Sequence, residues 1–359
     1  MEQSSPQREV RLLDPSWSVS ELMARIAKAL VGDGPALTLS PISQERVSQR
    51  IALIVTTTGS SGVAKEVGLT SAALIASAQA SNKSLGAEYG STWSLALPLN
   101  HIAGINVLIR SLESGTLPIN IIGIEGKYPK ADFTAIVPTQ LYRALNGDEN
   151  LLHHLQSAKK VLVGGAALTR ALRVEAESAG ITIVESYGST ETCGGCIYDG
   201  DPLDGVEVNI VENSRLAIKG KVLAHSYLNA ELELVNQDGW FISSDTAHME
   251  DSKVIVDGRI DDVIISGGEN ISLANIERTF AQGFPDCEFA IYAVTDAQWG
   301  QAIHCAIVGT SADEIAINAY LAAECGTVAK IKKFTYLQEL PLIGIGKVDR
   351  AELARRAYE

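Results

Sequence analysis

Residues 51–66 read IALIVTTTGSSGVAKE, in which five apolar residues run directly into a loop of Thr, Ser and Gly. A short run rich in Ile and Val predicts a buried strand. A glycine-containing loop after such a strand suits an anion-binding site, because glycine permits tight turns and close backbone approach. It is not a Walker P-loop, because Gly59 and Gly62 lie three positions apart and Lys65 is followed by Glu66. A polar turn with a solvated Lys65 is the alternative.

Similar apolar runs alternate with segments of helical period on the C-terminal side of this stretch. We expect buried strands at residues 51–55, 93–97, 119–122, 134–137, 160–163 and 181–184. We expect helices at residues 71–87, 102–114, 140–145 and 169–179. This alternation predicts an α/β domain with helices on the faces of a sheet. Loops at the carboxyl ends of such strands are the usual ligand sites.

The pattern changes after about residue 199. Short strands at 206–210, 216–218, 231–235 and 254–256, with turn signals between them, predict a small, mainly antiparallel β module. A further block has strands at 263–266, 289–294, 302–308 and 334–337 and helices at 274–280 and 312–324. We therefore expect a large N-terminal α/β domain with the β module, residues 1–260, and a small C-terminal α+β domain, residues 261–359.

Composition limits the classes of partner. The 359 residues carry a net charge of −14, which argues against nucleic acid, since phosphate backbones require clustered Lys and Arg. A small phosphorylated ligand needs only a local positive site. No apolar run reaches about 18 residues, so no membrane insertion is expected. The polar N-terminus lacks a signal-peptide core, and five cysteines do not make a disulfide framework, so we expect a cytoplasmic protein.

A second polar stretch, SYGSTETCGG, covers residues 186–195 and follows the strand predicted at 181–184. Tyr187 could stack on a planar ring, and Ser189 and Thr190 offer hydroxyl groups. Glu191 is a carboxylate suited to Mg²⁺, a hard cation that prefers oxygen ligands and substrate phosphates. The alternative is a capped turn, with Ser189 or Thr190 as N-cap and Glu191 favoured by the helix dipole.

Three further motifs lie nearer the C-terminus: DGWFISSD at 238–245, DGRIDD at 257–262 and GIGKVDR at 344–350. Asp245 could accept hydrogen bonds from a ribose diol, and Arg259 could donate to the same sugar or to a phosphate. Taken singly, residues of these two types are more often surface charges than ligands. Lys347, preceded by glycines on a predicted loop, could carry positive charge into a cleft or be a plain basic surface residue.

Taken together, the motifs resemble those of the acyl-adenylate-forming superfamily of acyl-CoA synthetases, luciferases and adenylation domains. Its phosphate loop T-S-G-[ST]-T-G-x-P-K-G corresponds to TTGSSGVAKE, and its other motifs correspond to YGSTE, GWFISSD, GRIDDVIISGGENI and GKVDR. The resemblance runs from about residue 51 to the end. Ala64 replaces the usual Pro, Ser61 a Thr, and Glu66 a Gly. We expect the Glu66 side chain to point outward, and the segment before the loop is shorter than is usual.

Two stretches resemble one branch more closely, the o-succinylbenzoate–CoA ligases of menaquinone biosynthesis. They are PLNHIAGINVLIRSLESG at 98–115 and the segment 187–206, with its TETC sequence. This resemblance implies an enzyme that uses ATP, Mg²⁺ and coenzyme A to convert o-succinylbenzoate to its CoA thioester through an acyl adenylate. A ligase for another carboxylate and a non-catalytic nucleotide-binding relative are the alternatives. A homodimer is compatible with the sequence.

The resemblance also implies roles for individual residues. Lys347 would meet the α-phosphate and the substrate carboxylate, Glu191 would hold Mg²⁺, and Asp261 would be the hinge about which the small domain rotates. The phosphates would be held by Thr190 and the loop residues Thr57, Thr58, Gly59, Ser60, Ser61, Gly62 and Lys65. The adenosine would be bound by Tyr187, Gly188, Gly164, Gly165, Ala166, Asp245 and Arg259.

The same resemblance implies a site for the acid and the thiol. Gly267 and Gly268 would let the pantetheine arm pass close to the backbone. His101 would line the substrate pocket or thiol tunnel, although a histidine at a helix start is the plainer interpretation. Arg110 would pair with a second substrate carboxylate, or else form a structural ion pair. Ser186 and Gly194 would shape the acid pocket.

Overall fold

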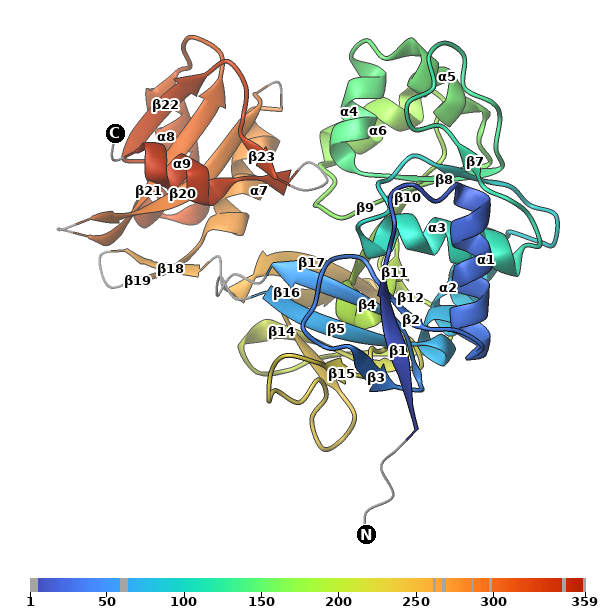
Figure 1. Ribbon diagram of the computed structural model, residues 1–359. Helices are drawn as coiled ribbons and strands as arrows, with labels where there is room; N and C mark the ends of the chain where they lie inside the picture. Colours follow the sequence, from blue (N-terminus) through green and yellow to red (C-terminus); the bar gives the residue numbers. More distant parts are fainter. Residues whose placement is uncertain are drawn as a thin grey trace. The chain divides into compact units, whose positions relative to one another are not determined.

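The computed structural model describes residues 6–58, 64–260, 263–266, 269–285, 287–296, 299–343 and 347–357. The chain divides into two compact units, each described here by itself (Figure 1). The first comprises Met1–Leu168, Glu175–Asn209 and Ala217–Ile242. The second comprises Thr169–Val174, Ile210–Leu216 and Ser243–Glu359. Among the described residues, no helix has the length and apolar character needed to cross a bilayer.

The opening stretch forms a hairpin within a six-stranded sheet of order β15-β5-β4-β2-β1-β3. Its strands are β1 (Gln7–Leu12), β2 (Ala36–Thr38), β3 (Arg46–Ser48), β4 (Ile51–Thr58), β5 (Ala64–Thr70) and β15 (Ser226–Tyr227). β4 is buried along residues 51–55, which confirms the predicted strand. The strand continues to Thr58, however, and β5 begins at Ala64, so most of the stretch that we predicted as loop is extended sheet.

The second sheet is the predicted α/β core, with strand order β12-β11-β10-β9-β8-β6-β7. Its members are β6 (Trp93–Leu95), β7 (Ile119–Asn120), β8 (Phe133–Ile136), β9 (Lys160–Gly164), β10 (Ile183–Ser189), β11 (Gly194–Tyr198) and β12 (Asp201–Pro202). The strands from β7 to β10 run parallel, and β11 pairs antiparallel with β10. The carboxyl ends of β9 and β10 therefore deliver Gly164 and Ser189 to the same edge.

Helices flank these sheets. They are α1 (Val19–Val31), α2 (Ser71–Leu85), α3 (Ile102–Glu113), α4 (Pro138–Leu145), α5 (Glu149–Ser157) and α6 (Arg170–Ser178). α1 begins with a capping box, in which Ser18 and Glu21 satisfy each other's backbone N–H groups, and ends at Gly32 with φ 79°. α1, α2 and α3 pack on one another. The sequence predicted α2 and α3 but not α1 or α5.

The β module has strand order β13-β14-β16-β17. The strands are β13 (Val206–Ile210), β14 (Arg215–Gly220), β16 (Phe241–Glu250) and β17 (Lys253–Arg259), with a 3₁₀ turn, η2 (Glu212–Ser214), between the first two. The strand predicted at 231–235 is wrong, because these residues form bends. The side chain of Asn236 accepts from the N–H groups of Asp238 and Trp240, which closes a turn there.

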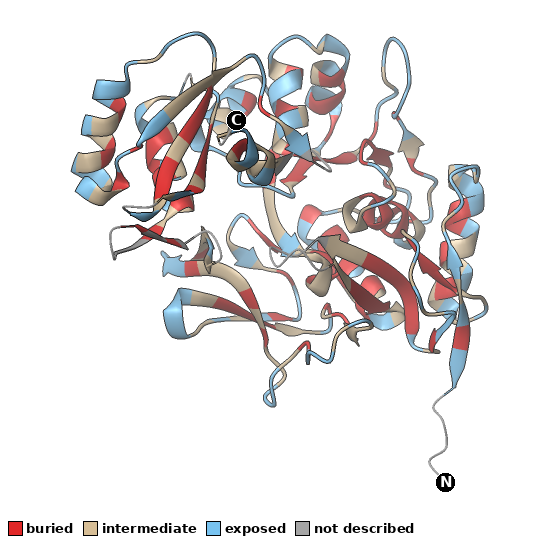
Figure 2. Ribbon diagram, turned by 60° about the vertical axis from the view of Figure 1, so that its left-hand side comes forward, coloured by how far each residue is buried: buried red, intermediate tan, exposed pale blue. Residues whose placement is uncertain are grey.

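The C-terminal α+β fold has a sheet covered on both faces. Its elements are β18 (Val263–Ser266), β19 (Glu269–Ser272), α7 (Leu273–Gly283), β20 (Phe289–Asp296), β21 (Gly300–Val308), α8 (Glu314–Cys325), η4 (Thr327–Ala329), β22 (Lys333–Leu337), β23 (Leu342–Ile343), β24 (Lys347–Val348) and α9 (Arg350–Arg356). Ile291 faces α7 and α8, whereas Tyr292 faces α9. Successive residues of β20 thus enter different cores, as the pleat requires. Figure 2 colours the ribbon by how far each residue is buried.

Candidate active site

The proposed phosphate loop connects β4 to β5. Thr57 pairs with Lys65 across the hairpin, and its hydroxyl lies 3.5 Å from the Lys65 carbonyl oxygen. The tip residues Gly59, Ser60, Ser61 and Gly62 lie outside the described residues. The hairpin therefore brings Thr57 and Lys65 side by side next to the connection between β4 and β5, where both were expected to face phosphate.

Tyr227 connects this hairpin to the proposed metal ligand. The Lys65 ammonium lies 4.9 Å from the centroid of the Tyr227 ring. The Tyr227 hydroxyl donates to Glu191 Oε1 at 3.1 Å. Burial, together with the adjacent Glu191 carboxylate, raises the pKa of Tyr227, so its phenol remains a donor. A cation, an aromatic ring and a carboxylate thus form one connected group.

Sequence reasoning missed Tyr227. It lies on β15, a two-residue strand that pairs with β5 and carries no periodic signal. Backbone hydrogen bonds just before Tyr227 hold this segment against Glu191 and β5. The N–H of Ala224 donates to the Glu191 carbonyl oxygen, and the N–H of His225 donates to the Gly68 carbonyl oxygen. These contacts join segments more than thirty residues apart, which no local pattern reveals.

Thr190 and Glu191 lie in a 3₁₀ turn, η1 (Thr190–Thr192), after β10. The turn ends at Cys193, whose φ of 52° lies in the left-handed region. Two buried side chains hold that residue, because Ser77 Oγ and Asn106 Nδ2 both donate to the Cys193 carbonyl, at 3.1 and 2.8 Å. Helices α2 and α3 therefore fix the backbone from which Glu191 projects.

Ser189 precedes this turn, and its hydroxyl is buried with no described hydrogen-bond partner. Its backbone N–H donates to Thr192 Oγ1, so the side chain does not act as the N-cap that was one alternative. A buried hydroxyl beside Thr190 and Glu191 suits a polar ligand, since unpaired buried polar groups are costly.

The expectation that Glu66 points outward is wrong. Glu66 is 9% exposed, Oε2 has no described partner, and burial raises the pKa of its carboxyl group above the ordinary value. Side chains alternate across a strand, so Glu66 lies on the opposite face of β5 from Lys65. The Gln44 side chain contacts it there. The buried carboxylate therefore does not share a face with the proposed phosphate-binding lysine.

The residues proposed for the adenine site gather at the ends of β9 and β10. Gly164 pairs with Ser186, and a Cβ at Gly164 would lie 2.9 Å from the Ser186 carbonyl oxygen. Gly165 follows with φ 83°, and Ala166 is exposed. Tyr187 is half-buried in β10, next to a register shift at Gly188, where a Cβ would collide with the Gly194 carbonyl. The glycines thus permit close backbone contacts at this edge.

The acid pocket was predicted around His101, Arg110, Ser186 and Gly194. His101 is the N-cap residue of α3 and makes no side-chain capping bond. Gly194 has φ 96°, and a Cβ there would meet Asn106 Nδ2. Arg110 lies two turns further along α3 and is 3% exposed. Nε of Arg110 has no described partner, and no described carboxylate lies within 4.0 Å of it.

Asp245 and Arg259 lie in the second unit. They pair directly in the register of β16 and β17, with Nη1 and Oδ1 3.8 Å apart. The two residues are therefore held together, as expected for a shared ribose site. Their position relative to Tyr187 stays a prediction.

Lys347 begins β24, which pairs with β23. Its side chain, the loop residue Asp261, and Gly267 and Gly268 lie outside the described residues. Arg350 anchors the segment three residues after Lys347. Its guanidinium bonds the Ile291 carbonyl at 3.0 Å and the Glu277 carboxylate at 2.6 Å.

Glu191 is suited to bind Mg²⁺ as one ligand among several. Mg²⁺ in nucleotide sites is bound by one or two carboxylates plus substrate phosphates and waters. Among the described residues, no cluster of three or more His, Cys, Asp or Glu side chains forms a self-sufficient metal cage. Glu191 is half-buried, and among the described residues only its Oε1 accepts a side-chain hydrogen bond, so a ligand set shared with substrate phosphate suits this arrangement.

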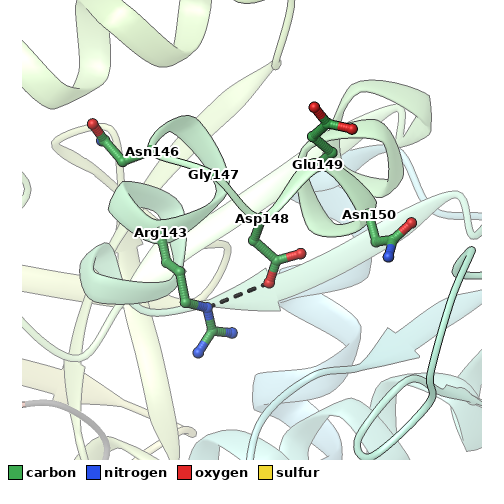
Figure 3. Close-up of a pocket in the computed structure, with 6 residues that line it drawn as sticks. All are labelled: Arg143, Asn146, Gly147, Asp148, Glu149 and Asn150. Carbon is green, nitrogen blue, oxygen red and sulfur yellow. Dashed lines mark ion pairs between the residues drawn. The ribbon is translucent and has the colours of Figure 1, made fainter.

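The surface hollow shown in Figure 3 is formed where α4 meets α5. It is lined by Arg143, Asn146, Gly147, Asp148, Glu149 and Asn150. Arg143 and Asp148 approach each other across it, at 3.4 Å. None of the motif residues lines this hollow, so it is not the candidate site.

Comparison with known proteins defines the class. Residues 3–239 match the family described as AMP-binding enzyme. The chain therefore belongs to the AMP-binding enzyme family.

Within this family, the chain is similar to individual proteins named as 2-succinylbenzoate--CoA ligases. The chain is 36% identical over 365 residues to the "Probable 2-succinylbenzoate--CoA ligase" of Mycobacterium tuberculosis, covering 93% of this chain and 94% of that one. It is 32% identical to the 2-succinylbenzoate--CoA ligase of Escherichia coli, covering 76% of this chain and 64% of that one.

Solved structures share the fold. An o-succinylbenzoate CoA synthetase (MenE) from Bacillus subtilis, in complex with the acyl-adenylate intermediate OSB-AMP, superposes with a TM-score of 0.73 at 22% identity, covering 96% of this chain and 82% of that one. ATP-bound MatB from Rhodopseudomonas palustris gives a TM-score of 0.77 at 20% identity, covering 97% and 83%. The acyl-adenylate-forming fold predicted from the motifs is confirmed.

Proposed function

We propose that the chain is an acid–CoA ligase that joins o-succinylbenzoate to coenzyme A at the expense of ATP, releasing AMP and pyrophosphate. The observation that supports it best is the connected group Lys65–Tyr227–Glu191, placed beside the end of β10. Such a group offers both a cation for phosphate and a carboxylate for Mg²⁺. The relatives named for this reaction supply the substrate. We place the enzyme in the cytoplasm, since its cysteines are free.

The reaction has two steps. A carboxylate oxygen of the acid attacks the α-phosphorus of ATP, the bond to the bridging oxygen breaks, and pyrophosphate leaves with that electron pair. The thiolate of coenzyme A then attacks the acyl carbon of the mixed anhydride, and AMP leaves as the acyl–oxygen bond breaks. Charge accumulates on phosphate oxygens in the first step, so positioned cations stabilise its transition state.

We propose a role in this reaction for each candidate site residue. Lys65 neutralises the departing phosphates, and Thr190 and the hairpin hydroxyls bond them. Bound Mg²⁺ supplies further positive charge at the phosphates. Tyr227 keeps Glu191 turned toward the lysine and fixes which carboxylate oxygen is left for the metal. Lys347 is proposed to meet the α-phosphate during the first step only, with the C-terminal domain then rotating about Asp261 to bring Gly267 and Gly268 to the thiol.

Arg110 is proposed to select an acid with two carboxyl groups. A buried guanidinium with no nearby carboxylate is electrostatically unfavourable, because desolvation of the charge is not offset. A second carboxylate on the substrate would supply the missing partner. Arg110→Ala is expected to raise KM for o-succinylbenzoate by at least tenfold and to leave KM for ATP unchanged. A change in KM for ATP alone would contradict this role.

The decisive experiment is a product assay. The protein is incubated with ATP, Mg²⁺, coenzyme A and a panel of carboxylic acids, and AMP, pyrophosphate and thioester are measured by mass. The proposal predicts that o-succinylbenzoate is converted to its CoA thioester, with one AMP released for each thioester formed. Turnover of a different acid would reassign the substrate, and ATP binding without turnover of any acid would indicate a non-catalytic relative. Sedimentation of the same sample tests the proposed homodimer.

A further inference from the structure

A chain of three buried polar side chains crosses from α2 to α3 by way of β11. Ser81 Oγ and the Tyr198 hydroxyl lie 2.7 Å apart, and Arg110 Nη2 lies 3.3 Å from the same Tyr198 oxygen. All three residues are 3% exposed or less. The face of the Arg110 guanidinium is covered by the Trp93 ring, whose centroid is 5.0 Å away.

The direction of the bond to Arg110 follows from the donors present. A guanidinium only donates, so the Tyr198 oxygen accepts from Arg110. Between Tyr198 and Ser81 either hydroxyl can be the donor. In both cases the phenol oxygen keeps a lone pair for Arg110, and Ser81 holds the phenol hydroxyl in place. Tyr198 holds one edge of the guanidinium, and Trp93 holds its face.

This arrangement leaves one edge of the Arg110 guanidinium without a described hydrogen-bond partner. Nε is buried and has no described hydrogen-bond partner, whereas Nη2 is held by a neutral group. A neutral partner orients the guanidinium without cancelling its charge. A carboxylate in place of the phenol would neutralise Arg110 and remove its affinity for a second anion.

The packing of β11 makes room for this tyrosine. A Cβ at Gly195 would lie 2.9 Å from Tyr198 Cε1 and would collide with Ser186 Oγ. Gly195 thus lets the tyrosine ring and Ser186, a residue assigned to the acid pocket, occupy adjoining positions. The ring reaches from this pocket wall to Arg110.

We propose that Tyr198, supported by Ser81, is a positioning residue that orients the charged Arg110 for the second carboxylate of the substrate. The inference rests on the proposed function, in which Arg110 receives a dicarboxylate. It predicts that the Tyr198 hydroxyl contributes to discrimination between dicarboxylates and monocarboxylates and contributes nothing to the use of ATP.

The test compares Tyr198→Phe, Ser81→Ala and the double variant with the wild-type protein. The substrates are o-succinylbenzoate and its two monocarboxylate analogues, lacking either the ring or the chain carboxyl group. Tyr292→Phe is the matched control, since Tyr292 is equally buried but its hydroxyl bonds Thr335 in the second unit. Melting temperatures report folding separately from specificity.

Tyr198→Phe is expected to lower kcat/KM for o-succinylbenzoate about tenfold relative to the better monocarboxylate, with KM for ATP unchanged. Ser81→Ala should have a smaller effect in the same direction, and the double variant should equal Tyr198→Phe, because both act through one phenol. An unchanged preference, or equal losses on all three acids, would overturn the inference and leave Tyr198 a packing residue.

A failure of the inference about Tyr198 can be distinguished from a failure of the proposed ligase function. If wild-type protein forms no thioester from o-succinylbenzoate, the proposed function fails by itself. The role of Tyr198 is then decided by calorimetry with o-succinylbenzoate. Weaker binding to Tyr198→Phe than to wild type supports the inference, and equal or absent binding overturns it.

Discussion

The carboxylate of Glu66 lies in a buried position that the sequence did not suggest. A charged residue beside a polar loop is normally solvated, and the strand register, which puts Glu66 on the face opposite Lys65 and against the Gln44 side chain, explains its burial. Because burial raises the pKa of Glu66 in the folded state, its ionised form costs stability at neutral pH.

Glu66→Gln is expected to stabilise the protein at pH 7 by about 1 kcal/mol, the order of one unsatisfied buried polar group. The wild-type carboxyl group is favourable when protonated, below its ordinary value of 4.5, and this contribution is lost as pH rises through the raised folded pKa. The difference between variant and wild type should therefore vanish near pH 4. Thermal unfolding from pH 4 to 8 measures it.

Glu9→Gln is the matched control for that experiment, because Glu9 is exposed on β1. It should leave the melting temperature unchanged across the same range. A stabilisation by Glu66→Gln that persisted undiminished at pH 4 would contradict the assignment to charge burial.

At the scale of single residues, the sequence proposed roles only for residues that lie in a recognisable motif. Glu191, Thr190 and Lys65 were proposed in this way; their roles stay predictions, and the structure connects Glu191 with Lys65 through Tyr227. The contacts of Tyr227, Ser77 and Tyr198 were not predicted. Each acts through one contact with a distant segment, and a lone tyrosine or serine in a sequence gives no sign of such a contact.

Among the elements, α9 holds the segment that follows β24 in place. Arg350 begins α9 and joins it to both β20 and α7 through the Ile291 carbonyl and Glu277. Glu277 also accepts from the Ile291 N–H, so the three groups form a closed ring of bonds. Lys347 lies three residues before this anchor.

Arg350→Ala is therefore expected to reduce pyrophosphate release from ATP and the acid about tenfold, because the charge-assisted bonds to the Ile291 carbonyl and to Glu277 that anchor this segment are lost. Thioester formation from supplied acyl adenylate should change little. Arg355→Ala, which breaks an exposed pair with Glu352, is the control and should have no effect. Equal loss of both half-reactions in Arg350→Ala would indicate a general folding defect instead.

Helices and strands whose apolar residues recur at a clear helical or strand spacing were predictable, and those with weak apolar patterns were not. The apolar spacing of α2 and α3 and the β-branched runs of β8, β9 and β10 marked them clearly. The segment 231–235 was mistaken for a strand because alternating Leu and Glu imitate a half-buried strand. Leu232 is in fact 58% exposed, and the turn at Asn236 competes with extension.

For the whole molecule, the two half-reactions provide the test of domain alternation. The boundary proposed between 260 and 261 remains a prediction, as does rotation about Asp261. The second compact unit contains β17 and most of β16 together with the C-terminal fold, so the division of the chain into compact parts does not follow the hinge motif.

Lys347→Ala is expected to slow acyl-adenylate formation by at least a hundredfold, since a removed transition-state donor costs about 2.7–4 kcal/mol. The second step, started from synthetic acyl adenylate and coenzyme A, should keep most of its rate. Lys332→Ala is the control, because that lysine stacks on Trp299. Rapid-quench measurement of both steps distinguishes alternation from a single fixed active site, in which both would fall together.

The edge of β5 has a consequence for how the chain is made. That edge is completed by Ser226 and Tyr227, and by Asn229, whose side chain bonds the Glu66 N–H and the Ala64 carbonyl. Gly68 pairs with Ser226, 158 residues later (226 − 68). At about 5–20 residues per second, a nascent chain on the ribosome would carry this outer edge of β5 unpaired for roughly 8–32 s. An open edge of that kind invites pairing with other chains. Translation speed and chaperone access over this interval, rather than final stability, should then govern the yield of active protein.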